Sequence, residues 1–270
     1  MVVQHNLSAI NTNRQMGVVT NALQKSTEKL SSGYKINRAA DDAAGLSISE
    51  KMRSQIRGLN KASDNAQDGI SLIQVAEGAL NETHSILQRM NELATQAAND
   101  TNTSVDRQSI KDEIKQLNEE LDRISSTTQF NKQDLLTGGF SGKLQVGALE
   151  GQTMDVKISL AVSANGLKVS AVEVSTNAKA GAAMQSIQDA IESVSKQRSK
   201  LGAIQNRLEH TINNLDTNAE NTQAAESRIR DTDMADEMVQ YSKNNILSQA
   251  GQSMLAQANQ QTQGVLSLLG

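Results

Sequence analysis

Apolar side chains recur at the three-and-four spacing of amphipathic helices through most of this chain. Five segments carry the pattern, at about 6–32, 45–99, 104–126, 178–230 and 233–270. At about 1.5 Å per residue, the second and fourth helices would each be about 75–80 Å long. Helices of that length cannot fold around one compact core, so the pattern predicts a mainly α protein. We expect long antiparallel coiled-coil helices that come from both chain ends.

The hydrophobic period changes to two in the middle of the chain, between about 140 and 175. The alternating apolar positions are Leu144, Val146, Val156, Ile158, Leu160, Leu167, Val169 and Val174. Gly151 and the dipeptide Asn165-Gly166 mark turns, and Asn-Gly is a strong hairpin signal. A small β-hairpin element is therefore expected between the long helices. Gly33 predicts a helix end, and Ser104 is the expected N-cap of the third helix.

The two chain ends differ from the rest in charge. Residues 244–270 contain no charged side chain, whereas the first 38 residues carry five basic side chains and one acid. An uncharged amphipathic helix is poorly suited to stand alone in water, because most helix stability comes from packing. We therefore expect both ends to order on assembly with neighbouring copies. The expected assembly seams contain Leu7, Ile10, Val19, Leu23, Leu30, Met238, Tyr241, Leu247, Met254, Val265 and Leu268.

Two alternatives to this interpretation of the ends stay open. The two terminal helices could form an intramolecular hairpin at the surface, although this does not explain the uncharged outer face. A helix lying on a membrane surface is less favoured, because such helices usually place Lys and Arg on the polar face. On the last helix, Met234, Met238, Tyr241, Leu247, Ala250 and Met254 are expected on one side.

Composition narrows the class of protein. The chain has no proline, cysteine or tryptophan, and about 1% aromatic residues. The lack of proline permits long helices, and the lack of cysteine excludes disulfides, thiol catalysis and Cys-ligated zinc. A formal charge of −4 argues against nucleic acid as a main partner. We expect no Sec-type signal peptide and no membrane insertion.

No arrangement of residues typical of an enzyme is found. The histidines His5, His84 and His210 are scattered, so no metal site is expected. The adjacent acids Asp41 and Asp42 are better explained by capping or turn formation than by catalysis. The glycine-rich stretch from 138 to 144 has the wrong spacing for a phosphate loop. We therefore expect no enzymatic activity and no cofactor.

Several long blocks of sequence resemble the bacterial flagellins. The matching blocks are residues 6–12, 30–49, 88–94, 118–124, 128–131, 201–208, 226–235 and 265–270. They occur in the order typical of the family and cover nearly the whole chain outside about 140–175. The short middle resembles a minimal form that lacks the large outer domains of longer relatives.

The resemblance implies a domain organisation and a set of partners. It implies the following segments: an inner-tube helix and linker at 1–40, N-side helices of an outer bundle at 41–139, the β element at 140–177, a C-side bundle helix at 178–230 and a second inner-tube helix at 231–270. It implies that the chain polymerises with itself into an extracellular flagellar filament for motility. Export without a Sec signal, an export chaperone and a filament cap are also implied.

The resemblance also implies recognition by the innate immune receptor Toll-like receptor 5. The matching positions are Arg89, Leu93 and Glu113. Met90 and Asn91 stand where many relatives have a Val-Arg pair, which removes a basic residue from this surface. Two other functions stay open at this stage: a hook–filament junction protein, and a secreted adhesin or immune-active ligand.

Overall fold

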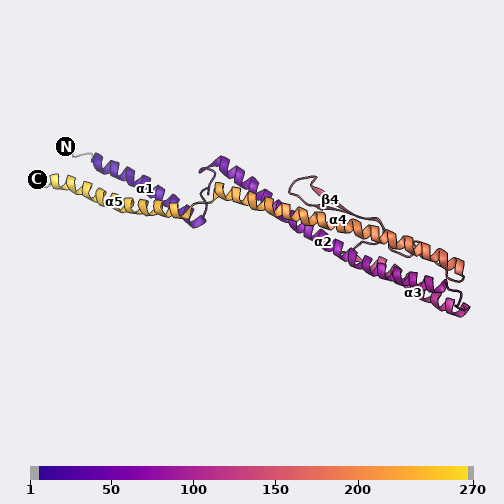
Figure 1. The fold of residues 1–270 in the computed structure, drawn as a ribbon. Helices are drawn as coiled ribbons and strands as arrows, with labels where there is room; N and C mark the ends of the chain where they lie inside the picture. Colours follow the sequence, from indigo (N-terminus) through magenta and orange to yellow (C-terminus); the bar gives the residue numbers. More distant parts are fainter. Residues whose placement is uncertain (1–5, 267–270) are drawn as a thin grey trace. The chain divides into compact units, whose positions relative to one another are not determined.

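The computed structural model describes residues 6–266, with side chains described as far as residue 261. Five helices and four short strands follow one another in the described part of the chain (Figure 1). The helices are α1 (Leu7–Ser32), α2 (Ala43–Ala97), α3 (Ser104–Thr127), α4 (Asn177–Arg230) and α5 (Met234–Leu266). The strands are β1 (Gln129–Phe130), β2 (Gln133–Asp134), β3 (Phe140–Gln145) and β4 (Thr153–Ile158). The mainly α fold with a small mid-chain hairpin is confirmed.

The helix ends follow from local capping. Asn6 accepts a hydrogen bond from the backbone N–H of Ala9 and so caps α1, which ends at Gly33 in the left-handed conformation. The expected N-cap at Ser104 was wrong, because Thr103 fills that position. Thr103 Oγ1 accepts from the N–H of Asp106, and the Asp106 carboxylate accepts from the N–H of Thr103. This reciprocal capping box shifts the start of α3 by one residue.

The chain divides into two compact units. We call residues 1–54 with 220–270 the terminal unit and residues 55–219 the central unit. The terminal unit contains α1 and α5, and the central unit contains α3 and the hairpin. Among the described residues, both hydrophobic clusters lie in the central unit.

The core of the central unit joins three helices. Fully buried side chains come from α2, α3 and α4, and the largest include Ile73, Leu80, Leu87, Met90, Ile114, Leu121, Ile187 and Leu201. Neighbouring positions of this set on each helix lie three, seven or fourteen residues apart, which fits the three-and-four repeat that the sequence pattern predicts. A smaller cluster joins Leu59 and Ala62 of α2 to Leu215 and Ala219 of α4. The central unit therefore has the burial that an independently stable bundle needs.

The β3–β4 hairpin lies on the helices of the central unit. The two strands pair antiparallel from Phe140 opposite Ile158 to Gln145 opposite Thr153. Residues Met154, Val156 and Ile158 of β4 face the core and alternate with exposed neighbours. The period of two thus identified both strands.

The rest of the alternating segment is not a strand, and here the expectation was wrong. Leu167, Val169 and Val174 are buried, but their backbone forms turns rather than a ladder. The N–H of Val169 donates to the carbonyl of Ala164, and the N–H of Ala164 donates to the Asp122 carboxylate of α3 at 2.8 Å. An irregular segment can bury alternate side chains when its polar backbone groups find such partners.

The first hairpin, β1–β2, was missed. Its two-residue loop is Asn131-Lys132, and both residues have positive φ, at 48° and 63°. Two positive φ values are typical of the type I′ turn, and Asn is favoured at the first position. Strands of two residues leave too little alternation in the sequence to be recognised.

Candidate assembly surface

Helices α1 and α5 lie side by side and antiparallel in the terminal unit (Figure 1). At one end, Asn6 Nδ2 donates to the carbonyl of Ala258 at 2.9 Å. At the other end, Lys29 Nζ lies 3.3 Å from Glu237 Oε2. Met16 packs against Gly251 midway along the pair. Contacts at three levels therefore define one register for the two helices.

The contact between α1 and α5 is formed by small and polar side chains as well as apolar ones. At least partly buried positions that repeat at three-and-four spacing are Ala9, Thr12, Met16, Val19, Leu23, Ser26 and Leu30 on α1, and Glu237, Tyr241, Asn244, Ser248, Gly251, Leu255 and Ala258 on α5. Of these, Ser26 and Ala258 are buried, and no residue in the described part of either helix joins a hydrophobic core cluster. The pair is therefore held by little buried apolar area.

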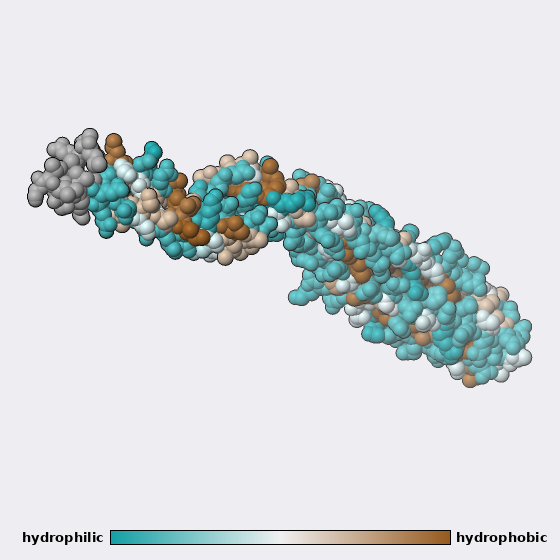
Figure 2. Space-filling model, turned by 60° about the vertical axis from the view of Figure 1, so that its left-hand side comes forward, coloured by the Kyte–Doolittle hydropathy of each residue, from teal (hydrophilic) through white to brown (hydrophobic). Residues whose placement is uncertain are grey.

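Both helices also expose large apolar side chains outside this contact. The exposed set is Leu7, Ile10, Val18, Met234, Met238, Val239, Ile246, Leu247 and Met254. Leu7 and Ile246 expose 73% and 66% of their surface. Leu7 and Val18 are eleven residues apart, which is three helical turns, so they share a face of α1. Figure 2 shows brown apolar residues among teal polar ones on this part of the molecule. We call this set the exposed apolar set.

The predicted seam residues fall into two groups. Val19, Leu23, Leu30 and Tyr241 are partly buried at α1–α5 contact positions. Leu7, Ile10, Met238, Leu247 and Met254 belong to the exposed apolar set. Val265 lies in α5 beyond the last described side chain, and Leu268 lies outside the described residues.

The expectation of one apolar side on α5 was wrong. Tyr241 faces α1, but Met254 is thirteen residues further on, which turns it about 140° away from Tyr241 around the helix. Apolar side chains therefore surround α5 rather than forming a stripe. Val18, Val239 and Ile246 were missed for the same reason, since the pattern of a single seam does not include residues on a second face.

Two short connectors hold the beginning of α5 beside the end of α1. The N–H of Lys35 donates to the carbonyl of Arg230 at 2.7 Å, and the N–H of Thr232 donates to the carbonyl of Gly33 at 3.0 Å. The Arg230 guanidinium lies 4.9 Å from the ring centre of Tyr34 and 2.8 Å from Glu50 Oε1. We call residues 33–42 and 231–233 the elbow.

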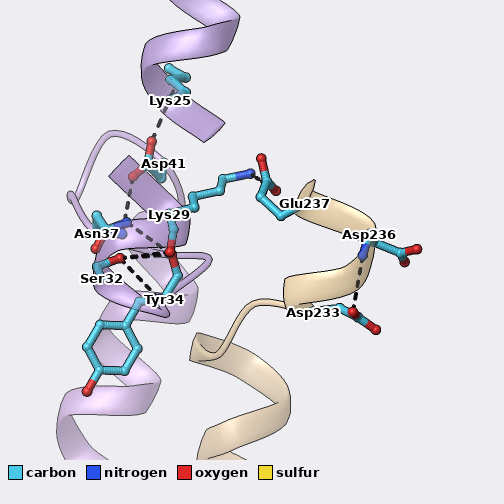
Figure 3. A network of polar contacts seen from close by, with 9 residues as sticks. All are labelled: Lys25, Lys29, Ser32, Tyr34, Asn37, Asp41, Asp233, Asp236 and Glu237. Carbon is cyan, nitrogen blue, oxygen red and sulfur yellow. Dashed lines mark hydrogen bonds and ion pairs between the residues drawn. The ribbon is translucent and has the colours of Figure 1, made fainter. Parts of the chain in front are cut away.

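Polar side chains stabilise the elbow (Figure 3). Asp41 Oδ2 accepts from the backbone N–H groups of Arg38 and Asn37, at 3.0 and 3.3 Å. The N–H of Arg38, together with Asn37 and the charges of Lys25 and Arg38, holds the pKa of Asp41 below its usual range. Asp42 Oδ1 accepts from the N–H of Gly45 in the first turn of α2. Both acids therefore act in capping and turn formation, as the sequence indicates.

The predicted receptor residues lie in the central unit. Arg89 Nε of α2 donates to Glu113 Oε1 of α3 at 2.9 Å, and Arg89 also contacts Glu92 at 3.3 Å. Both Arg89 and Glu113 are exposed. Leu93, by contrast, is only 2% exposed and belongs to the hydrophobic core. The structure thus brings Arg89 and Glu113 together and places Leu93 beneath the surface.

The described residues also bear on metal binding and on membrane insertion. No group of three or more metal-ligating side chains occurs within residues 6–266. In that range no helix is both long enough and apolar enough to cross a membrane. The terminal unit instead combines a weakly buried pair of helices with the exposed apolar set. Together they define a class of helical protein whose chain ends form a two-helix unit that still carries unburied apolar surface.

Comparison with known proteins identifies the family. The model for the bacterial flagellin N-terminal helical region matches residues 3–141, and the model for the C-terminal helical region matches residues 184–269. A flagellin of Halalkalibacterium halodurans is 56% identical over the full length of both chains, and one of Bacillus subtilis is 52% identical over the full length of both. The crystal structure of Bacillus cereus flagellin is 33% identical, with a TM-score of 0.51, over 60% of this chain and 94% of that one.

The chain belongs to the bacterial flagellin family. Flagellins are structural subunits of the extracellular flagellar filament, and this chain is a small form of that subunit. Its relatives match from end to end. The family therefore favours a filament subunit over the hook–filament junction protein and the adhesin.

Proposed function

We propose that α1 and α5 drive growth of the filament by packing the exposed apolar set against neighbouring copies of the chain. The observation that carries this proposal is the imbalance between the two units. Most large apolar side chains of the central unit form a buried core, although Val75, Val105 and Leu149 are exposed, whereas α1 and α5 leave nine large apolar side chains exposed. Burying such surface contributes about 25 cal/mol per Å². A chain that finds this burial only among its copies is driven to polymerise.

Folding and assembly are coupled in this proposal. The α1–α5 contact contains small and polar residues, so a single chain gains little from ordering its ends. From residue 244 onward no charged side chain favours a solvated helix face. The terminal segments are then only weakly stable as helices in the free chain, and they become stably ordered in the filament. Hydrogen exchange tests this directly: amides of α1 and α5 should exchange rapidly in the free chain and slowly in polymers. Full protection in the free chain would contradict the proposal.

Substitution of the exposed apolar set tests the packing itself. Val18→Gln and Ile246→Gln remove apolar side chains that touch little in the single chain, so the unfolding of the central unit should not change. Seeded growth, measured by light scattering and electron microscopy, should fall strongly. Val105→Gln is the matched control, because Val105 is at least as exposed as Val18 and Ile246 but lies on α3 of the central unit. Normal growth of the Ile246→Gln and Val18→Gln chains would exclude this surface as the driving contact.

Before assembly, the exposed apolar set is open to solvent and needs a binding partner that shields it from water. We propose that the export chaperone and the filament cap, implied by the family resemblance, contact this set, and that export bypasses the Sec route. The support is the exposure of Ile246, Leu247 and Met254 on α5. If a purified chaperone bound the Ile246→Gln and Leu247→Gln chain as tightly as the unchanged chain, this part of the proposal would fail.

We further propose that Arg89 and Glu113 form part of a surface that Toll-like receptor 5 recognises. Their exposed ion pair presents a fixed charge pattern across α2 and α3, and the buried Leu93 acts by packing rather than by contact. Arg89→Ala with Glu113→Ala should weaken receptor binding. Arg123→Ala with Glu120→Ala is the control, since this is another exposed pair on α3. Equal binding by the two variants would remove Arg89 and Glu113 from the receptor surface.

A further inference from the structure

The methionines of the chain are unequally exposed. Within residues 6–266, Met90 and Met154 are buried, and Met16, Met52 and Met184 are partly buried. The exposed ones in that range are Met234, Met238 and Met254, with 48%, 49% and 62% of their surface open. All three lie on α5. Exposed thioethers are thus concentrated on one helix of the terminal unit.

These three methionines belong to the exposed apolar set. Met234 and Met238 are one helical turn apart, and Met254 lies two turns after Leu247. Methionine is unbranched and adaptable, which suits it to contacts between copies. The apolar character of this helix surface therefore depends in part on sulfur atoms that are open to solvent in the free chain.

We propose that the thioethers of Met234, Met238 and Met254 form an oxidation switch that controls assembly. The oxidant is a hydroperoxide. Its terminal oxygen atom is transferred to Sδ, the O–O bond breaks, and a new S–O bond forms. The sulfur loses two electrons, the peroxide is reduced, and water leaves when the oxidant is hydrogen peroxide. The product is methionine sulfoxide, a polar side chain in place of an apolar one.

The switch acts on the free subunit before assembly and not on a subunit that is already in the polymer. A free chain exposes the three sulfur atoms and can be oxidised before it joins a polymer. The sulfoxide must then be buried among apolar neighbours, which is unfavourable unless the new oxygen finds a hydrogen-bond donor. A chain already in the polymer is protected because its sulfur atoms are covered. Reductases that act on methionine sulfoxide would restore the free chain.

This inference rests on the proposed function, and the experiment separates the two. The free full-length chain is treated with hydrogen peroxide, the sites of oxidation are mapped by peptide mass spectrometry, and seeded growth is measured. We expect oxidation at Met234, Met238 and Met254 well before Met90 and Met154. The concentration needed for growth should rise by at least about tenfold, because three side chains that are buried in the polymer become polar. Methionines in preformed polymers should oxidise at least about tenfold more slowly at the three α5 positions if a closed contact covers them.

Variants assign the effect to these sulfur atoms. The triple variant Met234→Leu, Met238→Leu and Met254→Leu keeps volume and apolar character, so it should polymerise and should keep growing after peroxide treatment. The control variant Met90→Leu should stay peroxide-sensitive. If the untreated chain does not polymerise, the proposed function fails. If the untreated chain polymerises and the fully oxidised chain grows equally well, or if peroxide blocks the triple variant too, the switch is wrong.

Discussion

Gly58 on α2 illustrates how closely the hairpin approaches the helix. A Cβ added at Gly58 would lie 2.8 Å from the Cβ and 3.3 Å from the Cα of Ala148, in the β3–β4 connection. The connection would have to move, and overpacking of this kind costs about 1–3 kcal/mol. The better helix propensity of alanine offsets about 0.5–1 kcal/mol of that cost. We therefore expect Gly58→Ala to lower the free energy of unfolding by about 1 kcal/mol, measured by urea denaturation.

Gly78 provides the matched control on the same helix. No atom lies within 4 Å of a Cβ added there. Gly78→Ala should therefore raise the free energy of unfolding by about 0.5–1 kcal/mol through helix propensity alone. Opposite signs at the two glycines would support close packing of the hairpin. If both substitutions raised the free energy of unfolding, the β3–β4 connection would have to move away from Gly58 without an energetic penalty.

Asp106 gives a prediction for pH. The Thr103 hydroxyl, followed by the Thr103 backbone N–H, holds the pKa of Asp106 below its usual value of 3.8. Because the folded pKa is lower than the unfolded pKa, the stabilisation is present above the unfolded pKa and is lost as pH falls through the folded one. Asp106→Asn should therefore increase amide exchange in the first turn of α3 at neutral pH. The difference from the unchanged chain should vanish at strongly acidic pH; a difference that persists there would exclude the carboxylate as its cause.

For single residues, the sequence predicts that a capping or surface residue is present better than it predicts which position has that role. It indicated a cap at the start of α3 but chose Ser104, because both Thr103 and Ser104 are good N-caps. The choice is made by Asp106, whose carboxylate reaches back to Thr103. Leu93 was placed at a receptor surface by resemblance, and its burial depends on the packing of three helices. Such contacts over long sequence distance are not visible in a local pattern.

Among the elements, the α1–α5 pair depends on few polar contacts for its register. Lys29 and Glu237 are both less than one-third exposed and lie at the elbow end. Small and polar residues elsewhere in the contact permit sliding, and a single charged pair can fix register. We expect Glu237→Lys to increase amide exchange in the first turns of α5, because it sets two cations against each other. Lys29→Glu combined with Glu237→Lys should restore much of the protection.

A second ion pair serves as the control for this charge exchange. Lys196 and Glu192 form an exposed pair on α4, and such pairs contribute little to stability. Glu192→Lys should therefore leave amide exchange of α4 nearly unchanged. If the double exchange at Lys29 and Glu237 fails to recover protection, then the geometry of the original pair, and not its charge, sets the register.

The sequence predicted the helices and strands well where the hydrophobic pattern repeated over many residues. All five helices were predicted from repeated three-and-four spacing, with ends displaced by two residues at most where a boundary was expected inside the chain. The strand pair β3–β4 followed from alternation. The segment at 159–176 did not, because its apolar side chains pack on the core while its backbone forms turns and hydrogen bonds to α3 rather than a strand ladder. The sequence did not show which face of α5 contacts α1, since apolar residues lie on several faces of this helix and give no single contact side.

For the whole molecule, the two units differ in how much apolar surface they bury, and this difference assigns a separate role to each. Within the described residues, the hydrophobic clusters lie in the central unit, and the terminal unit has none. Stability of the single chain should therefore come from the central unit, whereas growth of the filament should come from the terminal unit. The uncharged end of α5 was enough to predict this division, but the exposed second face of α1 required the structure.

A chain that lacks residues 1–35 and 235–270 tests this division. The deletion removes α1 and nearly all of α5 but leaves every residue of both hydrophobic clusters. The shortened chain should unfold cooperatively at the same urea concentration as the intact chain, because it loses little buried apolar surface. It should form no fibres by electron microscopy, even with fragments of intact filament as seeds. Fibres that grow from the shortened chain would show that the central unit carries the polymerising contacts, and the exposed apolar set would then need another explanation.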